Sequence, residues 1–344
     1  MKRRDFNRLS ISLAASSLAT AASARAGQSQ TLIKPPLPKS AGKWGLIAPG
    51  SPLSEKRIDH AIKNVEMIGF IPVLGQHARK QHGYLAGSDE ERLADLHDMF
   101  TRPEIEGIWC LRGGYGCTRL LPQIDYDIIA NNPKPFFGYS DITALHCAFL
   151  AKAGLISFHG PVASAELTEF SENSFRNIWI EDDLMLTPAP AHKSLAVTNA
   201  AYRVQTLIEG VVEGSLIGGN LSILAAMAGT PYAPTYRDKI VFIEDIGEKP
   251  YRIDRMLTQL VQATDFAEAA GYALGVFHDC EAPEGSQSLS LLETLGHFFS
   301  ALGKPMCVGF PIGHIDDQHT LPQGTRARLD TSAHSITLLE SPFA

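Results

Sequence analysis

The chain has 344 residues, a formal net charge of −7 at pH 7, a hydrophobic content of 44% and a charged content of 19%. This composition indicates a globular protein with room for two domains and excludes a disordered or fibrous chain. The negative charge argues against a nucleic-acid partner, because phosphate binding needs a basic surface. No run of 18 uncharged apolar residues occurs, so we expect no stable membrane insertion after removal of an N-terminal signal.

The first 26 residues have the composition of an export signal. The basic segment Lys2-Arg3-Arg4-Asp5-Phe6 precedes a stretch rich in Ala and Ser at 11–22, and Ala24-Arg25-Ala26 offers small residues for cleavage. Arg-Arg-x-Phe is similar to the twin-arginine signal, although Asn7-Arg8 differs from the commoner Leu-Lys. We predict a periplasmic protein exported by the twin-arginine route, with residues 1–26 removed. A basic N-terminal helix is the alternative.

Strands alternate with helices in the next segment, residues 40–165. Short apolar runs predict strands at 44–48, 71–74, 106–111 and 135–138. Apolar residues at helical spacing predict helices at 54–68, 88–99 and 142–153. This alternation predicts an α/β domain of the Rossmann or flavodoxin type, a parallel sheet with helices on both faces.

Residues 166–205 are less periodic, and we interpret them as the crossing between two domains. A C-terminal mixed α/β domain is predicted at 206–344. Its expected strands are 239–243, 273–277 and a hairpin of 327–330 with 335–339. Its expected helices are 221–228, 251–261 and 289–302.

Ser140 is the candidate nucleophile. It lies in Gly138-Tyr139-Ser140-Asp141, between a predicted strand and a predicted helix, at the edge of the sheet where α/β proteins bind ligands. The helix N-terminus offers free N–H groups to a developing oxyanion. The alternative is that Ser140 or Asp141 only caps the helix. Ile142 replaces the final glycine of Gly-x-Ser-x-Gly, so the α/β-hydrolase fold is not indicated.

A serine nucleophile needs a base and an orienting carboxylate. His314 follows an apolar strand and is the candidate base, with His159, which also follows a strand, as its competitor. Glu244 and Asp245 end another apolar strand and offer the carboxylate. The alternatives are a hydrogen-bonded structural histidine, and carboxylates that cap the next turn or pair with Arg252.

The segment Arg112-Gly113-Gly114-Tyr115-Gly116 is a glycine-rich turn after a strand. It lacks the GxGxxG spacing of a dinucleotide site, but its backbone N–H groups suit an oxyanion or a carboxylate. The five cysteines lie mostly in apolar runs and indicate buried side chains, although a bridge between Cys110 and Cys117 stays open. We predict no metal and no cofactor.

Seven segments resemble one known family in kind and order. They are LRGGYG at 111–116, GYSDITAL at 138–145, HGP at 159–161, GGNL at 218–221, IEDIGE at 243–248, YRIDR at 251–255 and GFPIGH at 309–314. Together they are similar to the LD-carboxypeptidases, or muramoyltetrapeptide carboxypeptidases, over nearly the whole chain after the signal.

The resemblance implies a Ser–Glu–His triad of Ser140, Glu244 and His314 in a groove between the two domains. It implies an oxyanion hole from the backbone N–H of Gly113 or Gly114 and of Asp141. It also implies a homodimer and a serine acyl-enzyme that releases the terminal D-alanine of a peptidoglycan tetrapeptide. The expected partner is a small peptide or muropeptide.

Other residues of these motifs are expected to contact the substrate: Arg112, His159, Asn220, Arg252 and Arg255. The three arginines are the candidates for binding the carboxylate of the leaving D-residue. One alternative function is that of a sister branch, which cleaves peptidyl-nucleotide antibiotics and confers immunity. A non-catalytic periplasmic binding protein would have a similar architecture but no need for the Ser–His–Glu set.

Overall fold

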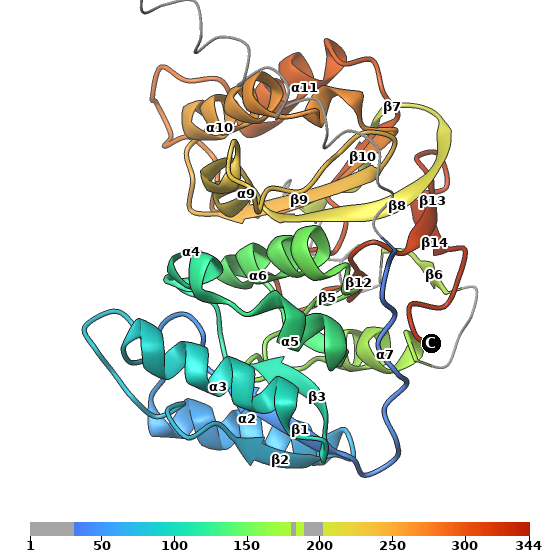
Figure 1. The fold of residues 1–344 in the computed structure, drawn as a ribbon. Helices are drawn as coiled ribbons and strands as arrows, with labels where there is room; N and C mark the ends of the chain where they lie inside the picture. The colour runs from blue at the N-terminus through green and yellow to red at the C-terminus, as the bar shows by residue number, and fades with distance from the viewer. Residues whose placement is uncertain (1–30, 180–183, 189–201) are drawn as a thin grey trace, which may run out of the picture. The chain divides into compact units, whose positions relative to one another are not determined.

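The computed structural model describes residues 31–179, 184–188 and 202–344, and one compact unit extends from Leu32 to Ala344. The predicted signal at 1–26 and part of the predicted crossing lie outside the described residues. The unit contains two sheets with helices packed against them, which confirms the predicted α/β class (Figure 1).

The first sheet has the order β12-β5-β4-β3-β1-β2. Its strands are β1 (Lys43–Ile47), β2 (Ile71–Leu74), β3 (Ile105–Cys110), β4 (Phe136–Gly138), β5 (Phe158–His159) and β12 (Leu321–Pro322). The first five are parallel, and β12 pairs antiparallel with β5 at the edge. The carboxyl ends of β1, β3 and β4 therefore meet at one edge, where ligands bind in such sheets.

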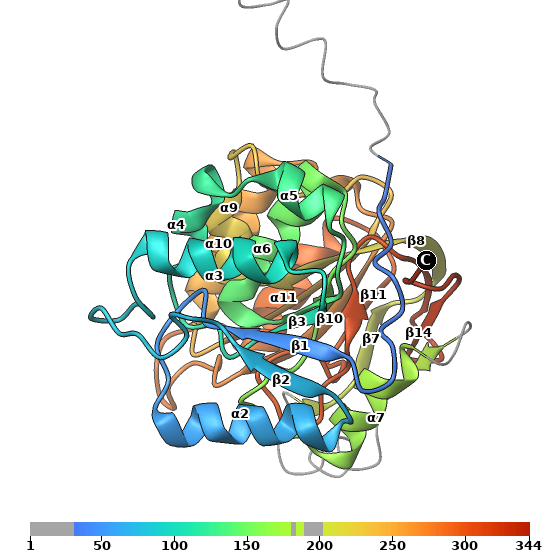
Figure 2. The ribbon, with the colours of Figure 1, turned by 60° about the horizontal axis from the view of Figure 1, so that its bottom comes forward.

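Helices cover both faces of this sheet, with α2 on one face and α3 and α6 on the other (Figure 2). The helices of this half are α2 (Glu55–Met67), α3 (Asp89–Thr101), α4 (Cys117–Leu120), α5 (Tyr126–Asn131), α6 (Thr143–Ala148) and α7 (Glu169–Asn177). Successive side chains of β4 point to opposite faces of the sheet and therefore belong to two separate hydrophobic cores. Phe136 packs against Phe100, whereas its neighbour Phe137 packs against Trp44 on the opposite face.

The second sheet has the order β6-β14-β13-β8-β9-β10-β11-β7. Its strands are β6 (Met185–Leu186), β7 (Gln205–Ile208), β8 (Val211–Asn220), β9 (Ile240–Ile246), β10 (Gly271–His278), β11 (Met306–Val308), β13 (Arg326–Asp330) and β14 (Ser335–Leu338). Strands β8 to β11 are parallel, and the outer strands are antiparallel. The associated helices are α9 (Leu221–Met227), α10 (Pro250–Ala263) and α11 (Leu291–Ser300).

The two halves are joined where α6 packs against α9 and β8. Thr143 Oγ1, in the first turn of α6, accepts a hydrogen bond from the backbone N–H of Asn220 at 3.0 Å. A side chain at Gly219 would collide with Thr143, so the glycine allows this close approach. The contact brings the end of β8 next to the turn that carries Ser140.

Several elements differ from the sequence prediction. The helix expected at 142–153 is a 3-10 turn, then α6, then a π-helical turn at Phe149–Ala153. Helix α7 lies within the segment predicted as an aperiodic crossing, and Thr168 caps its first turn. The predicted C-terminal hairpin is confirmed by the β13–β14 pairing. All five cysteines are free and buried, so Cys110 and Cys117 are not bridged.

Candidate active site

Ser140 stands in a sharp turn between β4 and α6. Its φ is 65°, in the left-handed region that side chains other than glycine rarely adopt. Neither the 3-10 turn at Ser140–Ile142 nor α6 has a side-chain cap, which rules out the alternative that Ser140 is a capping residue. Backbone strain of this kind is retained where function requires it and surrounding packing holds it.

His314 and Glu244 form a hydrogen-bonded row with Ser140. The Nε2 of His314 lies 3.0 Å from Ser140 Oγ, and its Nδ1 lies 2.7 Å from Glu244 Oε2. Glu244 is fully buried on β9, and His314 is in the loop after β11. A Cβ at Gly313 would lie 2.7 Å from Glu244 Oε2, so the glycine lets the histidine loop approach the carboxylate. The structure brings together the three residues predicted as a triad.

The electrostatics of the row favour a basic His314. Burial lowers the pKa of His314, but the charge and hydrogen bond of Glu244, with the charge of Asp245, outweigh burial and raise that pKa above its usual value. When Nδ1 donates to Glu244, Nε2 is left to accept the hydroxyl proton of Ser140. The arrangement is therefore that of a nucleophile, a base and an orienting carboxylate.

Asn220 lies behind this row. Its Nδ2 donates to Glu244 Oε1 at 3.4 Å and to Asp245 Oδ1 at 3.0 Å, while its Oδ1 accepts from Ile223 N at 3.3 Å. Asp245 also accepts from the N–H and hydroxyl of Ser222. The polar atoms of Asn220 thus have protein partners, and a contact of this side chain with substrate stays a prediction. Its side chain holds Glu244.

Gly113 and the backbone of Asp141 face each other beside Ser140. A Cβ at Gly113 would lie 3.0 Å from both Asp141 N and Ser140 Cβ. Gly114 has a φ of 93°, and a Cβ there would collide with Ser51. Within the described residues, the N–H groups of Gly113 and Asp141 donate to no protein acceptor. They are available to an oxyanion, and their role as the oxyanion hole stays a prediction.

A buried arginine and a buried aspartate hold the glycine turn in place. Arg92, on α3, is 1% exposed, and its Nη1 donates to the carbonyl oxygens of Pro49 and Gly116. The carboxylate of Asp141 accepts from Cys117 N at 2.9 Å, just after the turn. The loops after β1, β3 and β4 are therefore tied to one another around Ser140.

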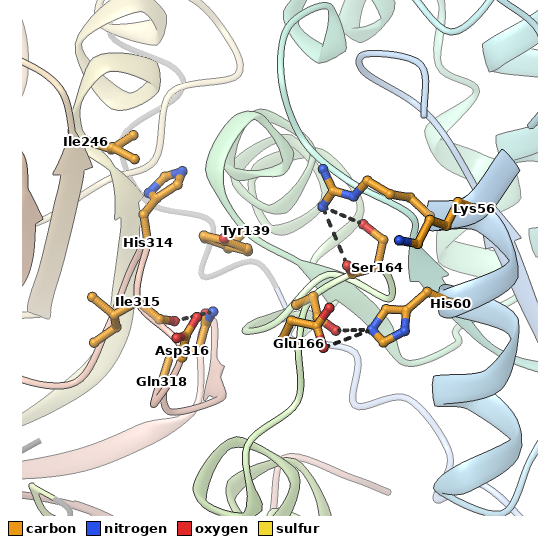
Figure 3. Close-up of a pocket in the computed structure, with 12 residues that line it drawn as sticks. Lys56, His60, Tyr139, Ser164, Glu166, Ile246, His314, Ile315, Asp316 and Gln318 are labelled. Atoms are coloured by element: carbon orange, nitrogen blue, oxygen red, sulfur yellow. Dashed lines mark hydrogen bonds and ion pairs between the residues drawn. The ribbon is translucent and has the colours of Figure 1, made fainter. Parts of the chain in front are cut away.

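A cavity of about 580 Å³ opens beside the row. Figure 3 shows His314 on one side of it, Lys56 and His60 of α2 on the other, and Tyr139 between them. The ring of Tyr139 packs against that of His314 with the ring centroids 4.8 Å apart. The other lining residues are Arg57, Ser164, Ala165, Glu166, Ile246, Ile315, Asp316 and Gln318.

His159 lies at the end of a strand, as the sequence predicts, but its side chain is enclosed in the core. It is fully buried at the end of β5, with its ring packed against Tyr139 and Phe242. Burial, with the charges of His146 and His314, lowers the pKa of His159 well below its usual value. His314, and not its competitor His159, is therefore the histidine that contacts Ser140, whereas a contact of His159 with substrate stays a prediction.

The three predicted arginines separate into two groups. Arg112 lies at the end of β3 and donates to the carbonyl oxygen of Pro52 at 3.3 Å, next to the glycine turn. Arg252 and Arg255 are exposed on α10 and do not line the cavity, and Arg252 lies 3.4 Å from Glu248. Substrate binding by these two α10 arginines has no support from the cavity lining and stays a prediction.

Sequence reasoning missed Lys56 and Arg57. One signal was present: both cations occur in the first turn of a helix, where the helix dipole disfavours positive charge. Both side chains line the cavity. In the described part of the chain, no group of three His, Cys, Asp or Glu side chains is arranged to hold a metal ion. No helix there is long and apolar enough to span a membrane.

Family models match both halves of the chain. The model of the LD-carboxypeptidase N-terminal domain matches residues 45–160, and that of the LD-carboxypeptidase C-terminal domain matches residues 213–329. The chain belongs to the LD-carboxypeptidase family. Its members are serine peptidases, and this chain is accordingly a serine-type carboxypeptidase. A non-catalytic binding protein is thereby excluded.

Individual relatives agree with this assignment. The chain is 40% identical to the "Probable murein peptide carboxypeptidase" of Bacillus subtilis, over 86% of this chain and 90% of the relative. It is 37% identical to the murein tetrapeptide carboxypeptidase of Pseudomonas aeruginosa, over 84% and 93%.

Solved structures from both branches of the family share the fold. The muramoyltetrapeptide carboxypeptidase from Oxalobacter formigenes matches with a TM-score of 0.74 and 32% identity, over 86% of this chain and 97% of that one. The microcin C7 self-immunity protein MccF, known from Escherichia coli, matches with a TM-score of 0.81 and 26% identity, over 91% and 100%.

Proposed function

We propose that this chain is an L,D-carboxypeptidase that removes the terminal D-alanine from peptidoglycan-derived tetrapeptides. The observation that carries the proposal is the row Ser140–His314–Glu244, with distances of 3.0 Å and 2.7 Å, at the wall of a cavity large enough for a peptide end. The murein peptide carboxypeptidases among the relatives, at 40% and 37% identity, support this substrate.

The proposed reaction follows from the geometry. His314 Nε2 takes the proton of Ser140 Oγ as that oxygen attacks the amide carbonyl, while Glu244 stabilises the imidazolium through Nδ1. The N–H groups of Gly113 and Asp141 stabilise the oxyanion. His314 then protonates the leaving amine, D-alanine departs, and water activated by the same histidine hydrolyses the ester.

A second candidate is cleavage of a peptidyl-nucleotide amide, as in the immunity branch. Its support is the similarity in fold to MccF, with a TM-score of 0.81. Sequence favours the first candidate, because identity to the curated self-immunity protein is 28%, against 40% and 37% for the two carboxypeptidases.

A substrate panel separates the two. The purified protein is incubated with a murein tetrapeptide, a murein pentapeptide and an aspartyl sulfamoyl adenosine-type amide, and products are identified by mass. The proposal expects loss of one alanine from the tetrapeptide only. Cleavage of the nucleotide amide, with the tetrapeptide intact, would move the chain to the immunity branch.

We further propose that the protein acts in the periplasm after twin-arginine export, on the basis of the arginine pair Arg3-Arg4 in the basic N-terminal segment. Lysine at both positions should leave precursor in the cytoplasm, because the export machinery recognises guanidinium groups. Full processing of the double-lysine variant in a periplasmic fraction would contradict this route.

We also propose that the processed protein is a homodimer. Sedimentation of the processed protein tests this proposal.

A further inference from the structure

The guanidinium groups of two arginines have no carboxylate partner among the described residues: that of Arg57, which lines the cavity, and that of Arg112, which directly precedes the glycine turn. Arg57 on α2 donates from Nη2 to the hydroxyl and carbonyl oxygens of Ser164, at 3.1 Å and 3.5 Å. Arg112 donates from Nη1 to Pro52 O at 3.3 Å. Within the described residues neither forms an ion pair, unlike Arg92 and Arg119, which share Asp89. Their protein partners are neutral oxygens, which leaves the positive charges uncompensated.

These two charges are also close to each other. Burial, and then the charge of Arg57, lower the pKa of Arg112. Lys56, in the same first turn of α2 as Arg57, is a second cation that lines the cavity. Lys56 and Arg57 are exposed positions in the first turn of α2, where the helix dipole disfavours positive charge. Locally unfavourable residues of this kind are expected at functional sites, where a bound anion would compensate the positive charge.

The acidic side chains at the cavity do not neutralise this wall. Glu166 lies 3.6 Å from His60 Nε2 and is 84% exposed. Asp316 lies on the opposite side of the cavity, next to Gln318 (Figure 3). The cavity therefore has a cationic side on α2 that faces the loop of His314.

We infer that Arg57 and Arg112, assisted by Lys56, bind the free α-carboxylate of the leaving residue. This inference rests on the proposed carboxypeptidase function. His314 must lie next to the leaving nitrogen to protonate it, and His314 lines the same cavity as Arg57. The leaving residue therefore occupies this cavity, and its carboxylate is only two bonds from that nitrogen. Guanidinium groups are well suited to hold it through paired N–H donors.

Binding of the carboxylate by these arginines also explains why cleavage would be limited to the C-terminal residue of a peptide. Arg112 directly precedes Gly113, so the carboxylate and the scissile carbonyl are held by adjacent residues of one turn. A substrate that continues beyond the leaving residue would place a neutral amide beside the two arginines, which would then stay uncompensated. Binding of the carboxylate should therefore align the carbonyl as well as increase affinity.

The test compares a tetrapeptide with its C-terminal amide in the wild type, Arg57→Gln and Arg57→Lys. Wild-type kcat/KM should favour the free acid by at least about 30-fold, and Arg57→Gln should lose about 10- to 100-fold on the acid with little change on the amide. Arg57→Lys should recover part of the loss. Lys63→Gln is the matched control, because it removes one charge from an exposed position of α2 outside the cavity. An unchanged acid-to-amide ratio in Arg57→Gln would overturn the inference.

A binding measurement keeps this result separate from the proposed function. Titration of the acid and the amide into Ser140→Ala, with and without Arg57→Gln, reports affinity without turnover. Preference for the acid that is lost with Arg57→Gln supports the site even if the wild type cleaves neither peptide, an outcome that would refute only the carboxypeptidase function. Equal binding of acid and amide by Ser140→Ala refutes the site itself.

Discussion

His314 Nε2 lies 3.0 Å from Ser140 Oγ although 174 residues separate the two in the chain. The serine belongs to the turn after β4 in the first sheet, and the histidine to the loop after β11 in the second. The contact therefore exists only when the two halves are packed together, which α6, α9 and β8 accomplish. The reactive geometry is a property of the whole fold and not of one half.

Ser140→Ala should fold normally and lose at least about three orders of magnitude in kcat, because it removes the attacking oxygen. Ser140→Gly should be equally inactive but more stable than Ser140→Ala by about 1 kcal/mol, since glycine accepts a φ of 65° without strain. Kinetics and denaturant unfolding of both variants provide the measurements. Near-normal turnover by either protein would show that Ser140 is not the nucleophile.

The pH dependence of kcat/KM should report His314. The imidazole accepts the serine proton only when neutral, so activity rises with pH through the pKa of His314. That pKa is raised, and the inflection should therefore lie above the usual histidine value of about 6.5. Glu244→Gln keeps the burial but removes the charge, which should shift the inflection to lower pH and reduce the plateau by about 100-fold or more. Identical inflections in both proteins would argue against this base.

Gly113→Ala should impair catalysis more than folding. Its Cβ would lie 3.0 Å from Asp141 N and from Ser140 Cβ, next to an N–H group that we propose for the oxyanion hole. A loss of about 100- to 1000-fold in kcat is expected, as for removal of an oxyanion-hole donor. Gly296→Ala is the control, because a Cβ there meets no atom within 4 Å and alanine favours the helix α11. Equal effects of the two substitutions on kcat would contradict a role of Gly113 in the oxyanion hole.

Arg92→Lys should weaken the support of the glycine turn. A lysine keeps the charge but cannot donate to Pro49 O, Gly116 O and Asp89 at once, as the guanidinium does. We expect a loss of about 2 kcal/mol or more in stability, and a fall in kcat with a smaller change in KM. Arg119→Gln removes only an exposed ion pair to Asp89 and should cost less than about 1 kcal/mol. A KM effect alone in Arg92→Lys would contradict a positioning role.

The parts of the site that follow from local patterns could be predicted from sequence. Strand-to-turn junctions identify Ser140, Glu244 and the Gly113-Gly114 turn, because short apolar runs end just before them. His314 could be chosen over His159 only through the family motif. The structure supplies the physical reason, which is that the ring of His159 is buried between Tyr139 and Phe242.

Other features depend on contacts between distant segments and could not be predicted from the sequence. Asn220 belongs to a family motif, but only the pairing of β8 with β9 brings its side chain within hydrogen-bond distance of Glu244 and Asp245. The amphipathic pattern of α2 predicts the helix and says nothing of what its exposed end faces, so Arg57 could not be assigned. The strand at Leu321–Pro322 is too short to leave a pattern and joins the first sheet only through its pairing with β5.

The most direct test of the central claim is the conversion of a purified murein tetrapeptide by the wild type and by Ser140→Ala, followed over time by liquid chromatography and mass spectrometry. We predict that the wild type yields equal amounts of tripeptide and free D-alanine, and that the variant yields neither at a rate above about one thousandth of wild type. Release of a dipeptide, or equal release of D-alanine by both proteins, would contradict a serine carboxypeptidase that acts through Ser140.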